Sequence, residues 1–259
     1  MNRYFKIMTW NVNSIKIREL NLLQCLLRHQ PDAVCLQELK GEEFNFPFTQ
    51  YENLGYHCTV FGQKAYNGVA LLTKDKPLRI LKGIPEFEDP NARYLQIQLP
   101  QCTLASIYAP NGESLQSAKF DYKKNWYSHL IRYLSTAIPK NRFIIAGDFN
   151  IAPDPNLDTT IPPEKQDRIL CSSFEVNMFQ KLLDLGLLDT SRYLYPSKEL
   201  FTWWDYRSGS FPQNKGMRIE HVLASVELGP NLVDSFVDKE ERSHERPSDH
   251  APLIVSFKF

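Results

Sequence analysis

Short apolar runs recur along the chain, and polar residues follow most of them. The β-branched and alternating composition of these runs predicts strands at residues 4–10, 33–37, 68–73, 94–99, 103–108, 143–146, 220–224 and 252–257. Leucines at helical spacing predict a helix over about 16–30 that Pro31 ends, and further helices are expected over about 118–137 and from Ser172 to near Gly186. Many strands with a few interspersed helices favour a core of two β-sheets flanked by helices.

Two local patterns refine this picture. Ser172, followed three residues later by Glu175, is typical of a capping box at the start of a helix. Residues 152–167 are rich in Pro, Asp and Thr, which predicts a long functional loop inside the domain rather than a linker between domains.

The length of the chain fits one folded domain. Its 259 residues are enough to bury a large core, so we expect a single domain over residues 1–259. No apolar stretch approaches the length of a membrane span, and the first residues lack the apolar region of a signal peptide. We therefore expect an intracellular, cytoplasmic protein, nucleoid-associated if its source is bacterial, that acts as a monomer and has no membrane partner.

The charged residues and cysteines exclude some classes of protein. The chain carries 30 basic and 30 acidic residues, so it lacks the basic excess of a protein that coats nucleic acid non-specifically, while a local basic face stays open. Its five cysteines are scattered and lack the paired spacing of a zinc site. Cys35 lies in an apolar run, which favours a small buried thiol.

The polar residues that follow the strands form a second pattern. Gly147 is expected to end the strand 143–146 with a sharp turn, and the alternation of an extended segment would make Asp148 and Asn150 face one ligand. Any one such residue is typical of a turn or a helix cap. Similar clusters follow other strands, however, and their recurrence favours one composite site made of Asn11, Glu38, Tyr108 with Asn111, Asp148 with Asn150, and Asp249 with His250.

The residue types in these clusters indicate metal-dependent phosphodiester chemistry. Asn11, Glu38 and Asp249 offer hard oxygen ligands, which suit Mg²⁺ or Mn²⁺ better than zinc. Such an ion stabilises the charge that builds on an attacked phosphorus. An aspartate held by an asparagine can take the proton of an attacking water, and a neighbouring imidazole can bind a phosphate oxygen. Walker, dinucleotide-binding and serine-hydrolase motifs are absent from the sequence.

Six motifs occur in the order found in a known superfamily. They are WNVN at 10–13, LQE at 36–38, YNGVA at 66–70, IYAPNG at 107–112, GDFN at 147–150 and PSDHAP at 247–252. With them, the chain resembles the endonuclease/exonuclease/phosphatase superfamily over residues 4–257. The segments FTWWDYR at 201–207 and GMRIE at 216–220 make it similar to one class within that superfamily, the exodeoxyribonuclease III class of apurinic/apyrimidinic endonucleases.

The resemblance implies a fold and an activity. The fold is a four-layered α/β sandwich of the deoxyribonuclease I type, with two packed, mostly antiparallel or mixed sheets between helices. The activity is that of a Mg²⁺-dependent nuclease of base excision repair, with Mn²⁺ able to substitute. Such an enzyme hydrolyses the phosphodiester 5′ to abasic sites in duplex DNA and leaves a 3′-hydroxyl. The resemblance also implies 3′→5′ exonuclease and 3′-phosphatase activity at 3′-blocked ends.

Two alternatives stay open. The chain could act on another phosphate, such as RNA or a phosphoinositide, but the segment 203–220 argues against this. It could also be a DNA-binding relative that has lost catalysis, but every expected catalytic residue type is present except for one exchange at Glu220.

The resemblance assigns roles to the residues that carry the reaction. Glu38 would bind the metal, with Asn11 and Asp249 close to it. Asp148 would orient or deprotonate the attacking water, and Asn150 would position Asp148 and the substrate. These assignments place the metal and the nucleophile at neighbouring strand ends.

Other residues would contact the phosphate. His250 would contact the scissile phosphate, and Tyr108 and Asn111 would touch that phosphate or the leaving oxygen. Glu220 would hold the imidazole of His250, where the family usually has Asp, so the longer side chain could place the imidazole differently. Asn13, where some relatives carry a carboxylate, favours one metal ion over two.

A third group would recognise the substrate. Trp203, Met217 and Ile219 map to the small apolar pocket that receives a baseless deoxyribose, and a missing base lowers the cost of flipping the sugar out. Trp204 is predicted to be an aromatic residue of the core. Five basic residues are predicted to contact backbone phosphates of DNA: Arg93, Lys123, Lys124, Arg207 and Arg218.

Overall fold

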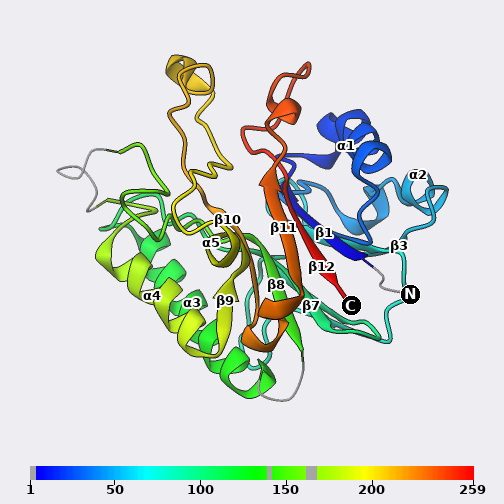
Figure 1. The fold of residues 1–259 in the computed structure, drawn as a ribbon, viewed down its shortest axis with the longest axis horizontal. Helices are drawn as coiled ribbons and strands as arrows, with labels where there is room; N and C mark the ends of the chain where they lie inside the picture. The colour runs from blue at the N-terminus through cyan, green and yellow to red at the C-terminus, as the bar shows by residue number, and fades with distance from the viewer. Residues whose placement is uncertain (1–3, 139–141, 162–167) are drawn as a thin grey trace.

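The computed structural model describes residues 4–138, 142–161 and 168–259, and it contains two six-stranded β-sheets that pack against each other (Figure 1). The first sheet has the order β11-β12-β1-β2-β4-β3. Its strands are β1 (Tyr4–Asn11), β2 (Ala33–Gln37), β3 (His57–Phe61), β4 (Val69–Thr73), β11 (Leu232–Val237) and β12 (Leu253–Lys258).

The second sheet has the order β5-β6-β7-β8-β10-β9. Its strands are β5 (Arg79–Lys82), β6 (Tyr94–Gln98), β7 (Thr103–Tyr108), β8 (Phe143–Asp148), β9 (Leu187–Asp189) and β10 (Glu220–Ser225). Each sheet has one parallel ladder, β1 with β2 and β7 with β8, among antiparallel ones, so both sheets are mixed.

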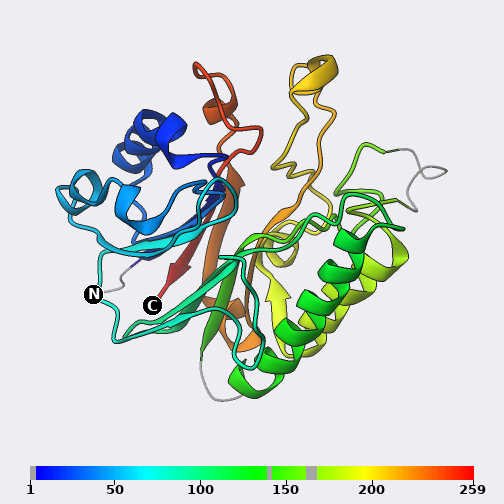
Figure 2. The ribbon, with the colours of Figure 1, turned by 180° about the vertical axis from the view of Figure 1, so that it is seen from behind.

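Helices cover the outer face of each sheet (Figure 2). On the first sheet lie α1 (Ile15–His29) and α2 (Phe48–Glu52), and on the second lie α3 (Ala118–Ala137) and α4 (Ser173–Asp184), while the short α5 (Thr190–Leu194) contacts β10 and β11. Apolar residues of both sheets form the central core, which is why each strand facing it reads as an apolar run. The four layers confirm the predicted fold class.

The helix boundaries follow local signals in the sequence. The capping box is confirmed, because the Ser172 side chain accepts from the Glu175 backbone and the Glu175 side chain accepts from the Ser172 backbone. Helix α1 ends at His29, where Gln30 adopts a left-handed backbone conformation just before Pro31. None of the described helices is long and apolar enough to cross a bilayer.

The prediction that Gly147 ends this strand was wrong. Strand β8 continues through Gly147 to Asp148, paired with β7 on one side and β10 on the other. A Cβ at Gly147 would lie 2.0 Å from the carbonyl oxygen of Ile107. Glycine is therefore needed here for close approach of the neighbouring strand and not for a turn.

Four strands were not expected from the sequence: β3, β5, β9 and β11. Each lies at the edge of its sheet; β3 and β5 carry exposed polar residues, β9 has only three residues, and β11 interrupts its apolar residues with Asp234 and Ser235. The predicted buried thiol at Cys35 is confirmed, and all five cysteines are free. Of the expected loop 152–167, residues 162–167 lie outside the described part of the chain.

Candidate active site

The predicted polar clusters meet where strands of the two sheets end side by side. In the second sheet, Asp148 at the end of β8 lies opposite Tyr108 of β7 and opposite Glu220 of β10. In the first sheet, Asn11 at the end of β1 lies opposite Gln37, the residue before Glu38. The packing of the two sheets brings these ends together.

Asn11 joins the two carboxylates at the centre of the site. Its Nδ2 donates to Glu38 Oε1 at 2.8 Å and to Asp148 Oδ2 at 2.9 Å. A ring nitrogen of His250 completes the group, whose ligand atoms lie within 4.8 Å of one another. The backbone of Asn11 is held in turn, because its carbonyl accepts a hydrogen bond from Ser248 Oγ at 2.7 Å.

Asn150 supports Asp148 differently from the prediction. Its backbone N–H, rather than its side chain, donates to Asp148 Oδ1 at 2.9 Å. The residue has a φ of 51°, so it has left the strand and its side chain does not run parallel to that of Asp148. The Asn150 side chain instead donates to Ala109 O and accepts from Asn111 Nδ2. It therefore ties two strand ends together.

Burial and charge give the two carboxylates different protonation behaviour. Burial and the negative charge of Glu220 raise the pKa of Asp148 to about 7. Burial alone would raise the pKa of Glu38, but Lys40 and the hydrogen bond from Asn11 outweigh it and lower that pKa. Lys40 Nζ lies 2.9 Å from Glu38 Oε2. An ionised Glu38 beside an Asp148 that titrates near neutral pH suits a general base next to a fixed anionic ligand.

His250 is held as an imidazolium. Its Nδ1 makes a short contact with Oε1 of Glu220. Burial would lower the pKa of His250, but the charges of Glu220 and Asp249 outweigh it and raise the pKa to about 10. Thr202 Oγ1 accepts from the backbone N–H of Glu220 and so fixes the start of β10. The charged ring is thereby oriented as a hydrogen-bond donor.

The exchange at Glu220 gives a prediction that separates charge from length. We expect Glu220→Gln to lower kcat by about 10²-fold, because glutamine keeps the length but cannot stabilise the imidazolium. We expect Glu220→Asp to keep at least the activity of the unmodified protein, because the charge is retained. Steady-state cleavage of an abasic duplex measures both variants. Equal losses in the two variants would show that the backbone is fitted to the length of Glu.

Tyr108 packs between the acidic group and a basic side chain. Burial and the charges of Glu38 and Asp148 raise its pKa well above its usual range, so the phenol stays protonated. The Arg93 guanidinium lies 4.7 Å from the Tyr108 ring centroid, and its Nη1 donates to Tyr108 O at 3.0 Å. These contacts make Arg93, predicted to bind phosphate, a residue that also supports Tyr108.

The three predicted pocket residues do come together. Trp203, Met217 and Ile219 belong to one small apolar cluster beside the carboxylates. Trp203 and Met217 pair through two backbone hydrogen bonds of 2.9 Å each. The indole Nε1 of Trp203 donates to Asp249 Oδ2 at 3.0 Å, which joins the apolar cluster to the acidic group. Trp204 is fully buried, as expected of a core aromatic.

Asp249 lies beside the central group and outside it. Its Oδ1 accepts from Asn13 Nδ2 at 2.8 Å, and Asn13 Oδ1 accepts from Lys40 Nζ. Lys40 was not predicted as a site residue, although the sequence places this cation two residues after Glu38. Thr202 was not predicted either, because its contact with the start of β10 exists only in the folded chain.

Two of the predicted phosphate contacts were wrong. Lys123 is fully buried in an ion pair with Glu175 and donates to the carbonyls of Asn111 and Asn150. Arg218 is also fully buried, and its guanidinium contacts Asp158 and Asp189. Buried charges are paired because desolvation is costly, so neither side chain is available to DNA.

The other basic residues stay on the surface. Arg207 is 86% exposed and pairs with Asp205, and Lys124 is 40% exposed and pairs with Asp121. Exposed pairs of this kind contribute little to stability, so these cations can exchange partners at low cost.

The comparisons with known proteins agree with this geometry. The family model described as Endonuclease/Exonuclease/phosphatase family matches residues 8–250. The chain belongs to this family. It is 39% identical to exodeoxyribonuclease III of Haemophilus influenzae, with 98% of this chain and 100% of the relative covered. The protein is accordingly a hydrolase of the exodeoxyribonuclease III type, a metal-dependent class.

Two solved structures have folds very similar to that of this chain. A 3′ phosphatase from Neisseria bound to a product DNA hairpin has a TM-score of 0.94 at 40% identity, with 98% of this chain and 100% of that chain covered. An AP endonuclease from Archaeoglobus fulgidus has a TM-score of 0.93 at 32% identity, with 98% and 99% covered.

The residues at the centre of the site fit a divalent cation. Two carboxylates whose oxygens lie within 4.8 Å repel each other in a buried setting, and a cation relieves that repulsion. The donor set is oxygen-rich and contains no thiolate, which is the preference of a hard ion. Asn11 donates from Nδ2 to both carboxylates and so orients them, and its Oδ1 accepts from the backbone N–H of Asn13 at 3.0 Å.

Proposed function

We propose that the protein is a Mg²⁺-dependent DNA-repair nuclease that hydrolyses the phosphodiester 5′ to an abasic site in duplex DNA. One observation carries the proposal: the hydrogen bond from Trp203 to Asp249 connects the group of Glu38, Asp148 and His250 to the apolar cluster that contains Trp203, Met217 and Ile219. The first part supplies phosphodiester chemistry, and the second supplies recognition of a sugar without a base.

Glu38 would hold the ion, with Asn11 and Asp249 close to it. When bound, Mg²⁺ neutralises charge on the phosphate oxygens. Asp148, held by Asn11 and by the Asn150 N–H, accepts the proton of the attacking water. The imidazolium of His250 donates to a nonbridging oxygen and stabilises the charge that develops there. Tyr108, which stays protonated, donates to the phosphate or to the leaving oxygen.

The apolar cluster would select the substrate. Trp203, Met217 and Ile219 would line a small apolar pocket that receives a baseless sugar, with Met217 and Ile219 buried beneath the half-buried Trp203. A baseless sugar has already lost most of its stacking, so flipping it into this pocket costs less than flipping an intact nucleotide. We expect 3′→5′ exonuclease and 3′-phosphatase activities at the same centre, because both also attack a phosphate at the 3′ side of a sugar. We also expect the protein to work as a monomer in the cytoplasm.

One assay with three substrates tests the proposal. An abasic duplex, an intact duplex and a duplex with a 3′-phosphorylated nick are incubated with the protein in Mg²⁺, in Mn²⁺ and in excess chelator. We expect the abasic duplex to be cut 5′ to the lesion, with all activity lost in chelator and restored by Mg²⁺. Binding of the abasic duplex without cleavage in Mg²⁺ would contradict the proposal and favour an inactive DNA-binding relative. Turnover of RNA or inositol phosphates in preference to abasic DNA would favour another superfamily phosphodiesterase.

The exposed cations predict the salt dependence of DNA binding. Removing one phosphate contact lowers the slope of log K against log salt by about 1. We expect this change for Arg207→Ala or Lys124→Ala, measured by fluorescence anisotropy in Ca²⁺ to prevent cleavage. Arg132→Ala serves as the control, because this exposed residue lies about two turns further toward the C-terminus of α3 than Lys124. An unchanged slope would show that the tested side chain does not contact DNA.

A further inference from the structure

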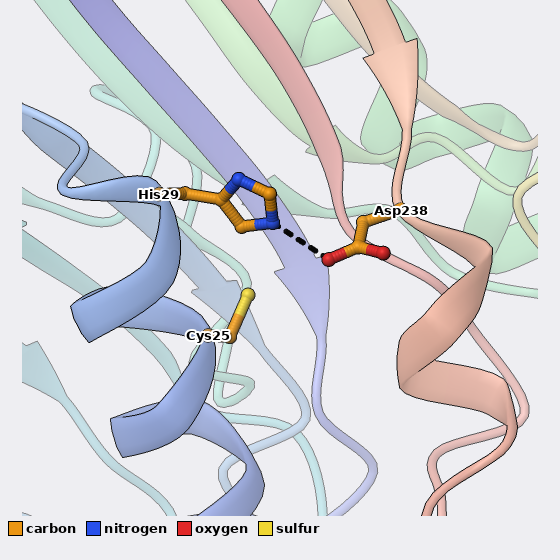
Figure 3. A group of neighbouring side chains, drawn as sticks. All are labelled: Cys25, His29 and Asp238. Carbon is orange, nitrogen blue, oxygen red and sulfur yellow. Dashed lines mark hydrogen bonds and ion pairs between the residues drawn. The ribbon is translucent and has the colours of Figure 1, made fainter.

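A second group of metal-ligating side chains lies away from the active site, between helix α1 and the end of strand β11. It consists of Cys25, His29 and Asp238, and one ligand atom of each lies within 4.8 Å of the others. Figure 3 shows the Cys25 thiol pointing toward the contact between the His29 ring and the Asp238 carboxylate. His29 Nε2 lies 2.6 Å from Asp238 Oδ2.

The helix itself brings two of the three ligands together. Cys25 and His29 are four residues apart on α1, so their side chains lie on the same face. Cys25 is fully buried, and the side chains of His29 and Asp238 are 16% and 9% exposed. The group is therefore enclosed and is open to solvent mainly at His29.

An independent observation points to a missing ligand. Glu241 is fully buried, and its Oε2 has no hydrogen-bond partner. The negative charge of Glu241 interacts electrostatically with the Cys25 thiol. Glu241 Oε1 contacts the Arg28 guanidinium, which also contacts Asp238. A buried carboxylate oxygen without a partner is costly, and a bound cation would satisfy it.

We propose that Cys25, His29 and Asp238 form a zinc-binding site, with Glu241 or a water molecule as the fourth ligand. A thiolate, an imidazole and a carboxylate together select zinc over Mg²⁺. Binding releases the thiol proton of Cys25 to solvent. In the loaded site the charges of Zn²⁺ and Arg28 balance those of the thiolate and the two carboxylates.

Closing the site needs only a small movement. With Zn–S of about 2.3 Å and Zn–N of about 2.0 Å, tetrahedral ligand atoms lie about 3.5 Å apart. Arg28 is 32% exposed and also contacts Glu240 Oε1 at 2.8 Å, so it can release Asp238 and keep another partner. The ion would replace the guanidinium at the Asp238 oxygen.

The site would tie α1 to the segment that leads into the active site. Asp238 precedes the turn at Lys239–Arg242, and Arg242 donates to the carbonyl of Ser248, two residues before His250. Arg18, which lies on α1 as Cys25 and His29 do, donates to the carbonyl of Pro247 at 2.9 Å. Zinc bound here would stabilise the support of the catalytic imidazole without touching the substrate.

Cobalt distinguishes this site from the active site, because the described residues that would hold an ion in the active site include no cysteine. We expect titration of the full-length protein with Co²⁺ to produce a thiolate-to-cobalt charge-transfer band that saturates at one equivalent and that Zn²⁺ abolishes. Cys25→Ser should lose the band, and Cys58→Ser, a half-buried cysteine on β3, should keep it. No band in the unmodified protein, or a band that survives Cys25→Ser, overturns the proposal.

Two further variants cover the case in which Cys25→Ser does not fold, which circular dichroism would reveal. His29→Gln should weaken zinc binding by about tenfold or more. Arg28→Leu should tighten it, because the competing cation is removed. Unchanged zinc affinity in His29→Gln, or loss of zinc binding in Arg28→Leu, would show that the group is only an ion-pair network.

Discussion

Replacing Asp148 by Asn is expected to lower the rate of abasic-site cleavage by about 10²–10⁴-fold, the usual contribution of a general base. Asparagine has nearly the same shape, so the hydrogen bonds from Asn11 and from the Asn150 N–H can be retained in part. It cannot accept the proton of the attacking water at neutral pH. Single-turnover cleavage of an abasic duplex in saturating Mg²⁺ measures the effect.

A matched control separates this effect from general damage. Asp184→Asn, at the exposed end of α4, should leave the rate unchanged. DNA affinity of the Asp148→Asn protein should be kept or increased, because a negative charge near the phosphate is removed. Full Mg²⁺-dependent cleavage by Asp148→Asn would refute the assignment of the base.

Lys123→Met is expected to lower the free energy of unfolding by about 3–5 kcal/mol, the cost of leaving one partner of a buried ion pair alone. Lys123 Nζ is paired with Glu175 and donates to Asn150 O at 2.7 Å and to Asn111 O at 3.1 Å. In the variant Glu175 keeps its hydrogen bonds from Leu170 and Ser172 but loses its counter-ion, and both carbonyls lose the ammonium group that donates to them. Urea unfolding followed by circular dichroism measures the change.

The neighbouring lysine provides the control for this prediction. Lys124→Met removes an exposed pair with Asp121 and should change stability by less than about 0.5 kcal/mol. The double variant Lys123→Met with Glu175→Gln should recover part of the loss, because no buried charge is left unpaired. Equal stability of the Lys123→Met and Lys124→Met proteins would show that the buried pair is dispensable.

Strands that face the central core could be predicted from the sequence because they carry its apolar residues. The run at 143–146 packs between neighbours on both sides, so burial leaves a continuous apolar signal. Strand β5 lies at the edge of its sheet with mostly exposed side chains, and β9 has only three residues. In such strands, pairing with a neighbour decides the structure, and that neighbour is distant in the sequence.

Burial of the basic residues also could not be predicted from the sequence. Lys123 and Lys124 are adjacent on α3 and look alike in the sequence, yet one is fully buried and the other exposed. A rotation of 100° between consecutive helical residues separates the two environments. Which of the two points inward depends on Glu175, which lies on another helix. A buried counter-ion therefore decided the role of Lys123.

By itself, the sequence determined the layered fold, the residue types of the site and the family, because strand-end motifs are local and carry their chemistry with them. Only the tertiary structure decided which partner each of these residues has. Asn11 bridges Glu38 and Asp148, Asn150 supports Asp148 through its backbone, and Arg218 is buried in ion pairs with Asp158 and Asp189. These pairings join residues from different strands and loops, and their energies depend on distance and burial, which the order of residues along a chain does not record.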